Sequence, residues 1–236
     1  MTELDLTPVP GRPNLLLGAY DLATLGYRAD EFFVSGSASS YAPAADFGPD
    51  GRWRAEPSGT ADYTTRIVAL TPTDDAVFNG TVIVEWLNVS GGIDAPAVWF
   101  MAHRELVRQG YAYVAVSAQR VGVEGGGVTL VANLSLKTLD PQRYSRLSHP
   151  GDAFCYDIYS QIGRLVRESD RGVLGGLRPD LVLAVGESQS AIFLTTYVNA
   201  VDPVAKVYDG FLVHSRFGSA APLDGATILD PSSEAS

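Results

Sequence analysis

The sequence has few of the residues that cross-links and metal sites require. It contains one cysteine, Cys155, and three histidines among 236 residues. A single cysteine cannot form an internal disulfide, and the histidines show neither the H-E-x-x-H nor the paired C-x-x-C spacing of metal ligands. The sequence therefore predicts no metal site.

Basic residues are also scarce. Lysine and arginine together number 17 against 27 aspartates and glutamates, which gives a net charge of -10. A protein with this charge is repelled by phosphate backbones and by anionic membrane surfaces. We therefore expect no nucleic-acid partner and no membrane partner.

Long hydrophobic runs are missing as well. The longest candidates, Thr81 to Leu87 and Tyr111 to Ala118, have the length of strands, whereas a membrane helix needs about 20 apolar residues. The opening MTELDLTPVP has neither the basic start nor the apolar stretch of a secretory signal. These absences predict a soluble protein of the cytoplasm.

The glycines do not form a nucleotide-binding motif. Gly122, Gly125, Gly126 and Gly127 lack the G-x-G-x-x-G order between a strand and a helix, and G-x-x-x-x-G-K-[ST] does not occur. We therefore expect no cofactor.

What the sequence does provide is a substantial core, since 46% of its residues are hydrophobic. Its first part predicts two edge strands of antiparallel type, Glu31 to Val34 and Tyr63 to Leu70. Gly, Pro, Ala and Ser are concentrated from Ser35 to Thr60, and this composition is typical of turns and loops around short strands.

From Gly80 onward, β-rich apolar runs alternate with segments of helical periodicity, which is typical of a parallel sheet covered on both faces. The sequence thus predicts an α/β fold with a mostly parallel sheet, helices on both faces and antiparallel N-terminal edge strands. Residues 1–216 would form this domain, and residues 217–236 an irregular, frayed tail. The predicted inner strands are Thr81 to Trp86, Tyr111 to Ser117, Leu181 to Val185 and Gly210 to Val213.

Ser188 lies where the predicted strand Leu181 to Val185 meets an amphipathic helix. Gly186 and Ser190 supply the small residues that a tight turn needs two positions before and after a nucleophilic serine. Such an elbow holds the serine in a strained conformation and directs the Gln189 N–H toward an oxyanion. The alternative is an ordinary helix start, because serine is a favoured N-cap.

The loop Asn88 to Gly92 follows the strand Thr81 to Trp86 and is the candidate for a second oxyanion donor. Gly91 and Gly92 allow backbone N–H groups to approach a ligand closely. A plain turn between a strand and a helix would have a similar sequence, so this alternative stays open.

Five blocks of the sequence follow one another in a distinctive order. They are Phe78 to Gly92, Gly110 to Val123, His149 to Arg164, Val185 to Ala191 and Asp209 to Arg216. Together they resemble a little-characterised bacterial family of α/β-hydrolase-domain proteins. The resemblance implies a serine hydrolase of esterase or lipase type that acts on a small-molecule ester, with Ser188 at the nucleophile position and Gly91 and Gly92 at the oxyanion position.

The sequence departs from this family after the elbow. In α/β-hydrolases the acid and the histidine of the triad both follow the serine, but here 48 residues follow Ser188 and they contain one histidine, His214. Members of the family are considerably longer. The sequence therefore resembles the N-terminal portion of the fold, and we expect its C-terminal strands to be missing.

His214 is the candidate base. It lies at the carboxyl end of the strand beside the one that carries Ser188, and adjacent strands are about 4.8 Å apart, so we expect it at the same edge of the sheet as Ser188. A role in the pocket wall or as a hydrogen-bonded structural residue is the alternative. Asp202 or Asp209 would have to orient it, and Asp209 precedes the strand and so lies at its opposite end.

The remaining reactive side chains have structural interpretations. We expect His103 to be solvated on a helix, His149 to have a structural or pocket-rim role, and Cys155 to be packed in the core. Glu187 is adjacent to Ser188 in the sequence and should point away from it, which does not suit a triad acid.

Two functions follow from these residues. The first is hydrolysis of carboxylic esters through an acyl-enzyme on Ser188. The alternative is a truncated, catalytically silent fragment that acts as a binding module or needs a complementary chain. In either case a sheet edge left exposed by missing strands predicts self-association.

Overall fold

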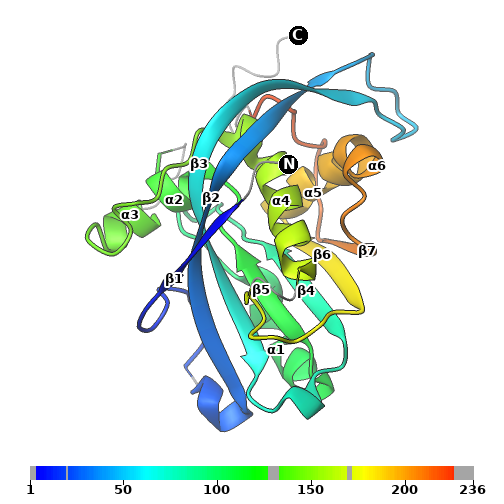
Figure 1. The fold of residues 1–236 in the computed structure, drawn as a ribbon. Coiled ribbons are helices and arrows are strands. Elements are labelled where there is room, and N and C mark those ends of the chain that lie inside the picture. Colours follow the sequence, from blue (N-terminus) through cyan, green and yellow to red (C-terminus); the bar gives the residue numbers. More distant parts are fainter. Residues whose placement is uncertain (1–3, 20, 127–132, 169–171, 226–236) are drawn as a thin grey trace.

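The computed structural model describes residues 4–19, 21–126, 133–168 and 172–225. In this part of the protein seven strands form one sheet in the order β1-β2-β3-β5-β4-β6-β7 (Figure 1). The strands are β1 (Asp5–Val9), β2 (Tyr27–Pro43), β3 (Ala55–Pro72), β4 (Thr81–Trp86), β5 (Ala112–Val116), β6 (Leu181–Glu187) and β7 (Gly210–His214).

The helices of the described residues lie mostly between the later strands. The α-helices are α1 (Ala97–Gln109), α2 (Arg120–Glu124), α3 (Leu136–Leu139), α4 (Cys155–Arg167), α5 (Gln189–Thr196) and α6 (Asp202–Ala205). The 3-10 turns are η1 (Leu22–Leu25), η2 (Asp75–Val77) and η3 (Asp152–Phe154), and η5 (Tyr197–Val201) is a π-helical turn. None of these helices is long and apolar enough to cross a lipid bilayer.

The later half of the sheet is parallel, as the sequence predicts. β5, β4, β6 and β7 run in one direction, and Trp86 at the end of β4 pairs with Val116 of β5 and Gly186 of β6. The carboxyl ends of these strands therefore meet at one edge of the sheet, which is where ligands bind in open α/β sheets. β1, β2 and β3 form the antiparallel edge, and β3 also joins β5 in antiparallel fashion.

The prediction of loops from Ser35 to Thr60 is wrong for most of that segment. β2 and β3 have 17 and 18 residues and pair along a long curved ribbon that passes over α4 (Figure 1). Helix α4 supports this ribbon with polar side chains: the Ser39 N–H donates to Asp157 at 2.8 Å, and Gln161 Nε2 donates to the Ser37 carbonyl at 3.0 Å. Tertiary contacts of this kind stabilise strands whose composition alone suggests loops.

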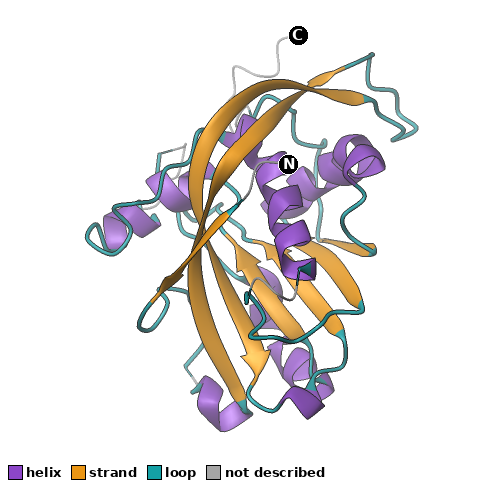
Figure 2. Ribbon diagram, viewed as in Figure 1, coloured by secondary structure: helices purple, strands orange, loops and turns teal. Residues whose placement is uncertain are grey.

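Helices cover both faces of the sheet (Figure 2). α4 and α5 pack on one face, where Trp86 of β4 meets Tyr159 of α4 and Phe193 of α5. On the other face, Trp99 of α1 packs against Tyr113 of β5. This two-sided cover explains why the inner strands are continuous apolar runs.

β7 is the last strand on its side of the sheet and pairs with β6 alone among the described strands. Leu212 and Val213 are 50% and 38% exposed, so both faces of this strand reach solvent. Residues 217–225 contain no helix or strand, but they pack rather than fray: Ala221 and Leu223 are buried, and Thr196 Oγ1 donates to the Ala221 carbonyl. Gly127 and residues 226–236 of the predicted tail lie outside the described residues.

Candidate active site

Ser188 occupies a strained turn between β6 and α5. Its φ and ψ are 55° and -114°, a conformation that L-residues rarely adopt and that persists only where the surrounding structure imposes it. Ser188 is in the N-cap position of α5, yet its side chain makes no capping hydrogen bond. The interpretation as an ordinary capped helix start therefore does not explain this residue.

The small neighbours of Ser188 have the packing that a tight elbow requires. A Cβ added at Gly186 would lie 3.1 Å from both the carbonyl carbon and the carbonyl oxygen of Ser190, and 3.2 Å from the Ala191 nitrogen. The Ser190 hydroxyl is buried; it donates to the Glu187 carbonyl and accepts from the Glu187 N–H, both at 2.9 Å. Ser190 thus closes the turn from inside.

Gln189 begins α5, so its N–H lies at the positive end of the helix dipole. Its side chain links two other segments: Nε2 donates to Gln119 Oε1 at 2.9 Å, and Oε1 accepts from the Val89 N–H at 3.4 Å. Gln119 in turn donates to Asp152 at 3.0 Å. This series of amide contacts fixes the start of α5 against the loops that follow β4 and β5.

The loop after β4 is closed by a short antiparallel bridge. The N–H of Asn88 donates to the Ala95 carbonyl at 3.0 Å, and the N–H of Ala95 donates back to Asn88 at 2.9 Å. Asn88 Nδ2 also donates to the Glu187 carbonyl at 2.9 Å, which ties the loop to the residue before Ser188. Asn88 therefore uses its donors to hold the loop in place.

The predicted oxyanion donors differ in availability. The Gly92 N–H donates to the Val89 carbonyl at 2.9 Å, so like the Asn88 N–H it is engaged within the loop. Gly91 N–H has no acceptor among the described residues, and the Val89 N–H makes only the 3.4 Å contact with Gln189. Val89 was included in the sequence-based prediction only as part of the loop Asn88 to Gly92 and was not singled out.

His214 lies beside the elbow but does not contact the Ser188 hydroxyl. Its carbonyl accepts the Ser188 N–H at 3.0 Å, and its ring Nδ1 lies 3.1 Å from Ser215 Oγ. Among the described residues no hydrogen bond joins the His214 ring to Ser188.

Neither candidate partner of His214 is arranged to orient its ring. Asp209 accepts from the Val182 N–H at 2.7 Å and pairs with Arg167, so it lies at the amino end of β6, as expected. One carboxyl oxygen of Asp202 is buried without a hydrogen-bond partner, and burial raises the pKa of this group.

The other two histidines make local contacts. His149 is buried, with Nε2 2.9 Å from the Ala118 carbonyl and Nδ1 accepting from the Gly151 N–H at 3.2 Å. Burial lowers its pKa, which favours the neutral ring that this pair of contacts requires. His103 is partly buried, and its Nδ1 lies 3.1 Å from the Trp99 carbonyl.

Glu85 was not singled out from the sequence, although an acidic residue in the apolar strand TVIVEW was a usable signal. Its carboxylate accepts from the Val98 and Trp99 N–H groups at 2.8 and 3.1 Å and from the Tyr113 hydroxyl at 2.6 Å. It thereby caps α1, whose N-cap residue is a proline. Burial raises the pKa of Glu85 to about 7 despite these three donors.

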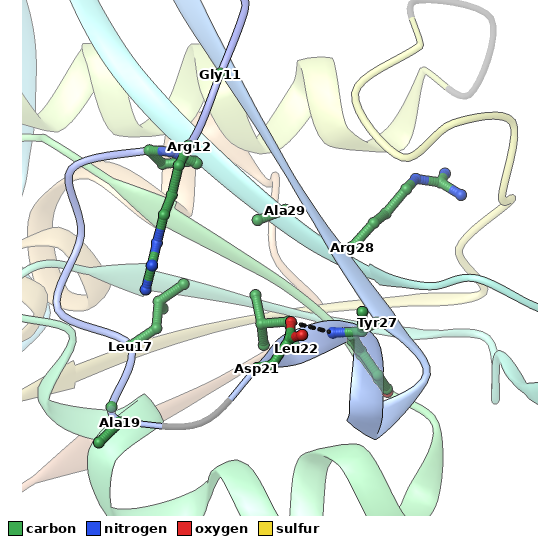
Figure 3. A pocket seen from close by; sticks show the side chains of 12 residues that line it. Gly11, Arg12, Leu17, Ala19, Asp21, Leu22, Tyr27, Arg28 and Ala29 are labelled. Carbon is green, nitrogen blue, oxygen red and sulfur yellow. Dashed lines mark hydrogen bonds between the residues drawn. The ribbon is translucent and has the colours of Figure 1, made fainter.

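A cavity of about 840 Å³ lies away from this site, between the N-terminal segment and the start of β2 (Figure 3). Arg12, Leu17, Leu22 and Tyr27 are among its lining residues, and none of the candidate catalytic residues is. It is therefore separate from the candidate active site.

A serine on a strained turn after a parallel strand, under a helix N-terminus, defines the α/β-hydrolase class of fold. The protein belongs to the family whose model is described as "Alpha/beta hydrolase domain", which matches residues 6–235. No curated protein matches the sequence.

Several solved structures are similar to this chain at low identity. They include acetyl xylan esterase 1 from Thermoanaerobacterium sp. (13% identity, TM-score 0.35, 83% of this chain and 48% of that one) and esterase Est22 (12%, 0.35, 73% and 41%). A glucuronoyl esterase from Solibacter usitatus is also similar (11%, 0.34, 83% and 48%). The match spans less than half the length of each of these proteins.

Proposed function

We propose that Ser188 is the nucleophile of a hydrolase that cleaves small-molecule carboxylic esters through an acyl-enzyme. The observation that carries this proposal is the conformation of Ser188, at φ 55° and ψ -114°, with a side chain that does not cap α5. Strain of this kind is typical of functional positions. The membership in the α/β-hydrolase domain family supports the same chemistry.

In the proposed reaction, Ser188 Oγ attacks the ester carbonyl carbon while a base accepts the hydroxyl proton. The carbonyl oxygen becomes an oxyanion that the N–H of Gln189 and an N–H of the loop after β4, from Val89 or Gly91, stabilise. Collapse of this intermediate expels the alcohol, which takes up the proton, and water then hydrolyses the acyl-enzyme. In this scheme Asn88 and Gly92 maintain the shape of the loop.

His214 is our candidate for the base. To act, its ring must leave Ser215 and approach Ser188 Oγ within about 2.6 to 3.2 Å. The hydrogen bond from the Ser188 N–H to the His214 carbonyl holds the two residues side by side. We expect His214→Ala to lower ester turnover; unchanged turnover would remove His214 from the mechanism.

The proposal is tested by incubating the protein with a fluorophosphonate and measuring its intact mass. We expect one adduct, which peptide mapping places on Ser188, and no adduct on Ser188→Ala. Ser145→Ala is the matched control, because Ser145 is an exposed serine whose hydroxyl contacts only the Gln142 carbonyl. A folded protein without an adduct would refute an activated Ser188.

A second candidate function is a catalytically silent domain that binds an ester without cleaving it, or that needs a complementary chain. The observation in its favour is that the Ser188 hydroxyl has no hydrogen-bond partner among the described residues. Without a base, serine keeps the low nucleophilicity of an alcohol. Shifts of the Gln189 amide resonance on addition of p-nitrophenyl acetate, without release of nitrophenol, would favour this function.

A further inference from the structure

The loop after β4 is held in place by a buried ion pair between Arg66 and Asp94. Arg66 is on β3 and is fully buried, and Asp94 is in the loop itself and is 3% exposed. Arg66 Nη2 donates to Asp94 Oδ2 at 2.7 Å. The Ser117 hydroxyl, just beyond the end of β5, donates to the same carboxylate oxygen and accepts from Arg66 Nε at 2.9 Å. The loop is thus fixed to β3 and to the end of β5.

Asp94 acts on the part of the loop that faces the elbow. It directly precedes Ala95, which forms the bridge with Asn88, and Asn88 in turn holds the Glu187 carbonyl. A continuous series of contacts therefore runs from Arg66 through Asp94 and Asn88 to the residue before Ser188. The Val89 and Gly91 amides lie in the loop that this series encloses.

The space around Asp94 is shaped for the carboxylate. A Cβ at Gly122 of α2 would lie 1.8 Å from Asp94 Oδ1, so a glycine is needed there for the carboxylate to keep its place. Asp94 Oδ1 is buried and has no hydrogen-bond partner among the described residues. An unpaired carboxylate oxygen costs free energy, and buried ion pairs contribute little net stability. Stability alone therefore does not account for this arrangement, whereas fixing a single position of the loop does.

We infer that the Arg66–Asp94 pair is a positioning device that sets the distance between the second oxyanion donor and Ser188. The inference rests on the proposed function, since it assigns a task to the loop in that reaction. Asp94 and Arg66 are positioning residues, because they act through the loop and do not reach the substrate.

The first part of the test follows loop mobility and does not require activity. Hydrogen exchange of residues 87–96, measured by mass spectrometry, should be at least about 10-fold faster in Asp94→Asn than in the parent protein, with exchange in α4 unchanged. Gly122→Ala should have the same effect, because its Cβ displaces the carboxylate while both charges remain. Asp62→Asn and Gly48→Ala are the matched controls: Asp62 is exposed, and a Cβ at Gly48 meets its nearest atom at an ordinary 3.4 Å.

The second part measures the catalytic consequence. With a p-nitrophenyl ester, Asp94→Asn and Gly122→Ala should lower kcat about 10-fold or more and leave KM within about twofold, because oxyanion donors act mainly on the transition state. If the pair had a purely structural role, the variants would have a lower melting temperature. At a temperature where they are folded, their kcat would then match that of the parent protein.

The outcomes separate the inference from the function on which it rests. Parent-like loop exchange in both variants, or parent-like kcat with an active parent, would overturn the inference. A parent protein that neither hydrolyses the ester nor takes up fluorophosphonate would refute the proposed function instead, and loop exchange would then decide whether the pair anchors the loop.

Discussion

Gly186→Ala tests whether the elbow depends on the close approach of β6 and α5. The added Cβ would lie 3.1 Å from both the carbonyl carbon and the carbonyl oxygen of Ser190, and 3.2 Å from the Ala191 nitrogen. Ordinary contacts of a Cβ begin near 3.4 Å, so the first turn of α5 must move by about 0.3 Å. These neighbours are backbone atoms of a helix and cannot rotate away. Overpacking of this kind costs about 1 to 3 kcal/mol of the free energy of unfolding.

The same displacement moves the Gln189 N–H relative to Ser188 Oγ, so the reactivity of the folded protein should fall as well as its stability. We expect urea denaturation to show the loss of about 1 to 3 kcal/mol, and the rate of fluorophosphonate labelling of the folded protein to drop about 10-fold or more. Gly48→Ala should leave both unchanged within error. If Gly186→Ala matched the parent in stability and labelling, a small residue would not be required two positions before Ser188.

Three further predictions concern the surroundings of the site. Burial raises the pKa of Glu85 to about 7 in the folded protein, against an ordinary value of 4.5. Its contribution to stability is therefore full below pH 4.5 and is lost as the pH rises through 7. Glu85→Gln should flatten this part of the stability profile, measured by thermal unfolding from pH 4 to 8. Ser190→Ala removes both hydrogen bonds that close the elbow and should cost about 1 to 3 kcal/mol in urea denaturation, whereas an unchanged midpoint would contradict a closing role for Ser190. The exposed edge of β7 should pair with a second copy of the protein, so light scattering should show association as the protein concentration rises. The double variant Leu212→Lys, Val213→Lys should associate less. A parent protein that stays monomeric would count against this edge pairing.

The sequence was sufficient to predict the parallel half of the sheet and the elbow, because both depend on local patterns. The strands β4, β5, β6 and β7 are apolar runs bounded by turns, and their boundaries follow from the sequence within one or two residues. The elbow needs only Gly186, Ser188 and Ser190 in order, and the conformation of Ser188 is the strained one that this order implies.

The long ribbon of β2 and β3 was missed for a physical reason. Its outer part is rich in glycine, serine and alanine, which favour loops when no other segment supports them. The ribbon is stabilised by contacts with α4, more than 100 residues later in the sequence, such as that of Ser39 with Asp157. A pattern read along the sequence does not contain these contacts.

The loop after β4, the predicted source of the second oxyanion donor, shows the same limit at the level of single atoms. From the sequence, Gly91 and Gly92 were equal candidates for this donor. Which backbone N–H is free depends on how the loop folds back on itself, and two buried carboxylates determine that conformation. Glu85 fixes the start of α1 after the loop, and Asp94 fixes the loop to Arg66. Both are acidic residues within otherwise apolar stretches, TVIVEW and GGIDAPAVW. Burial of a carboxylate is unfavourable unless it is paired or hydrogen-bonded, so such residues next to a predicted oxyanion loop indicate which backbone atoms the protein holds in place.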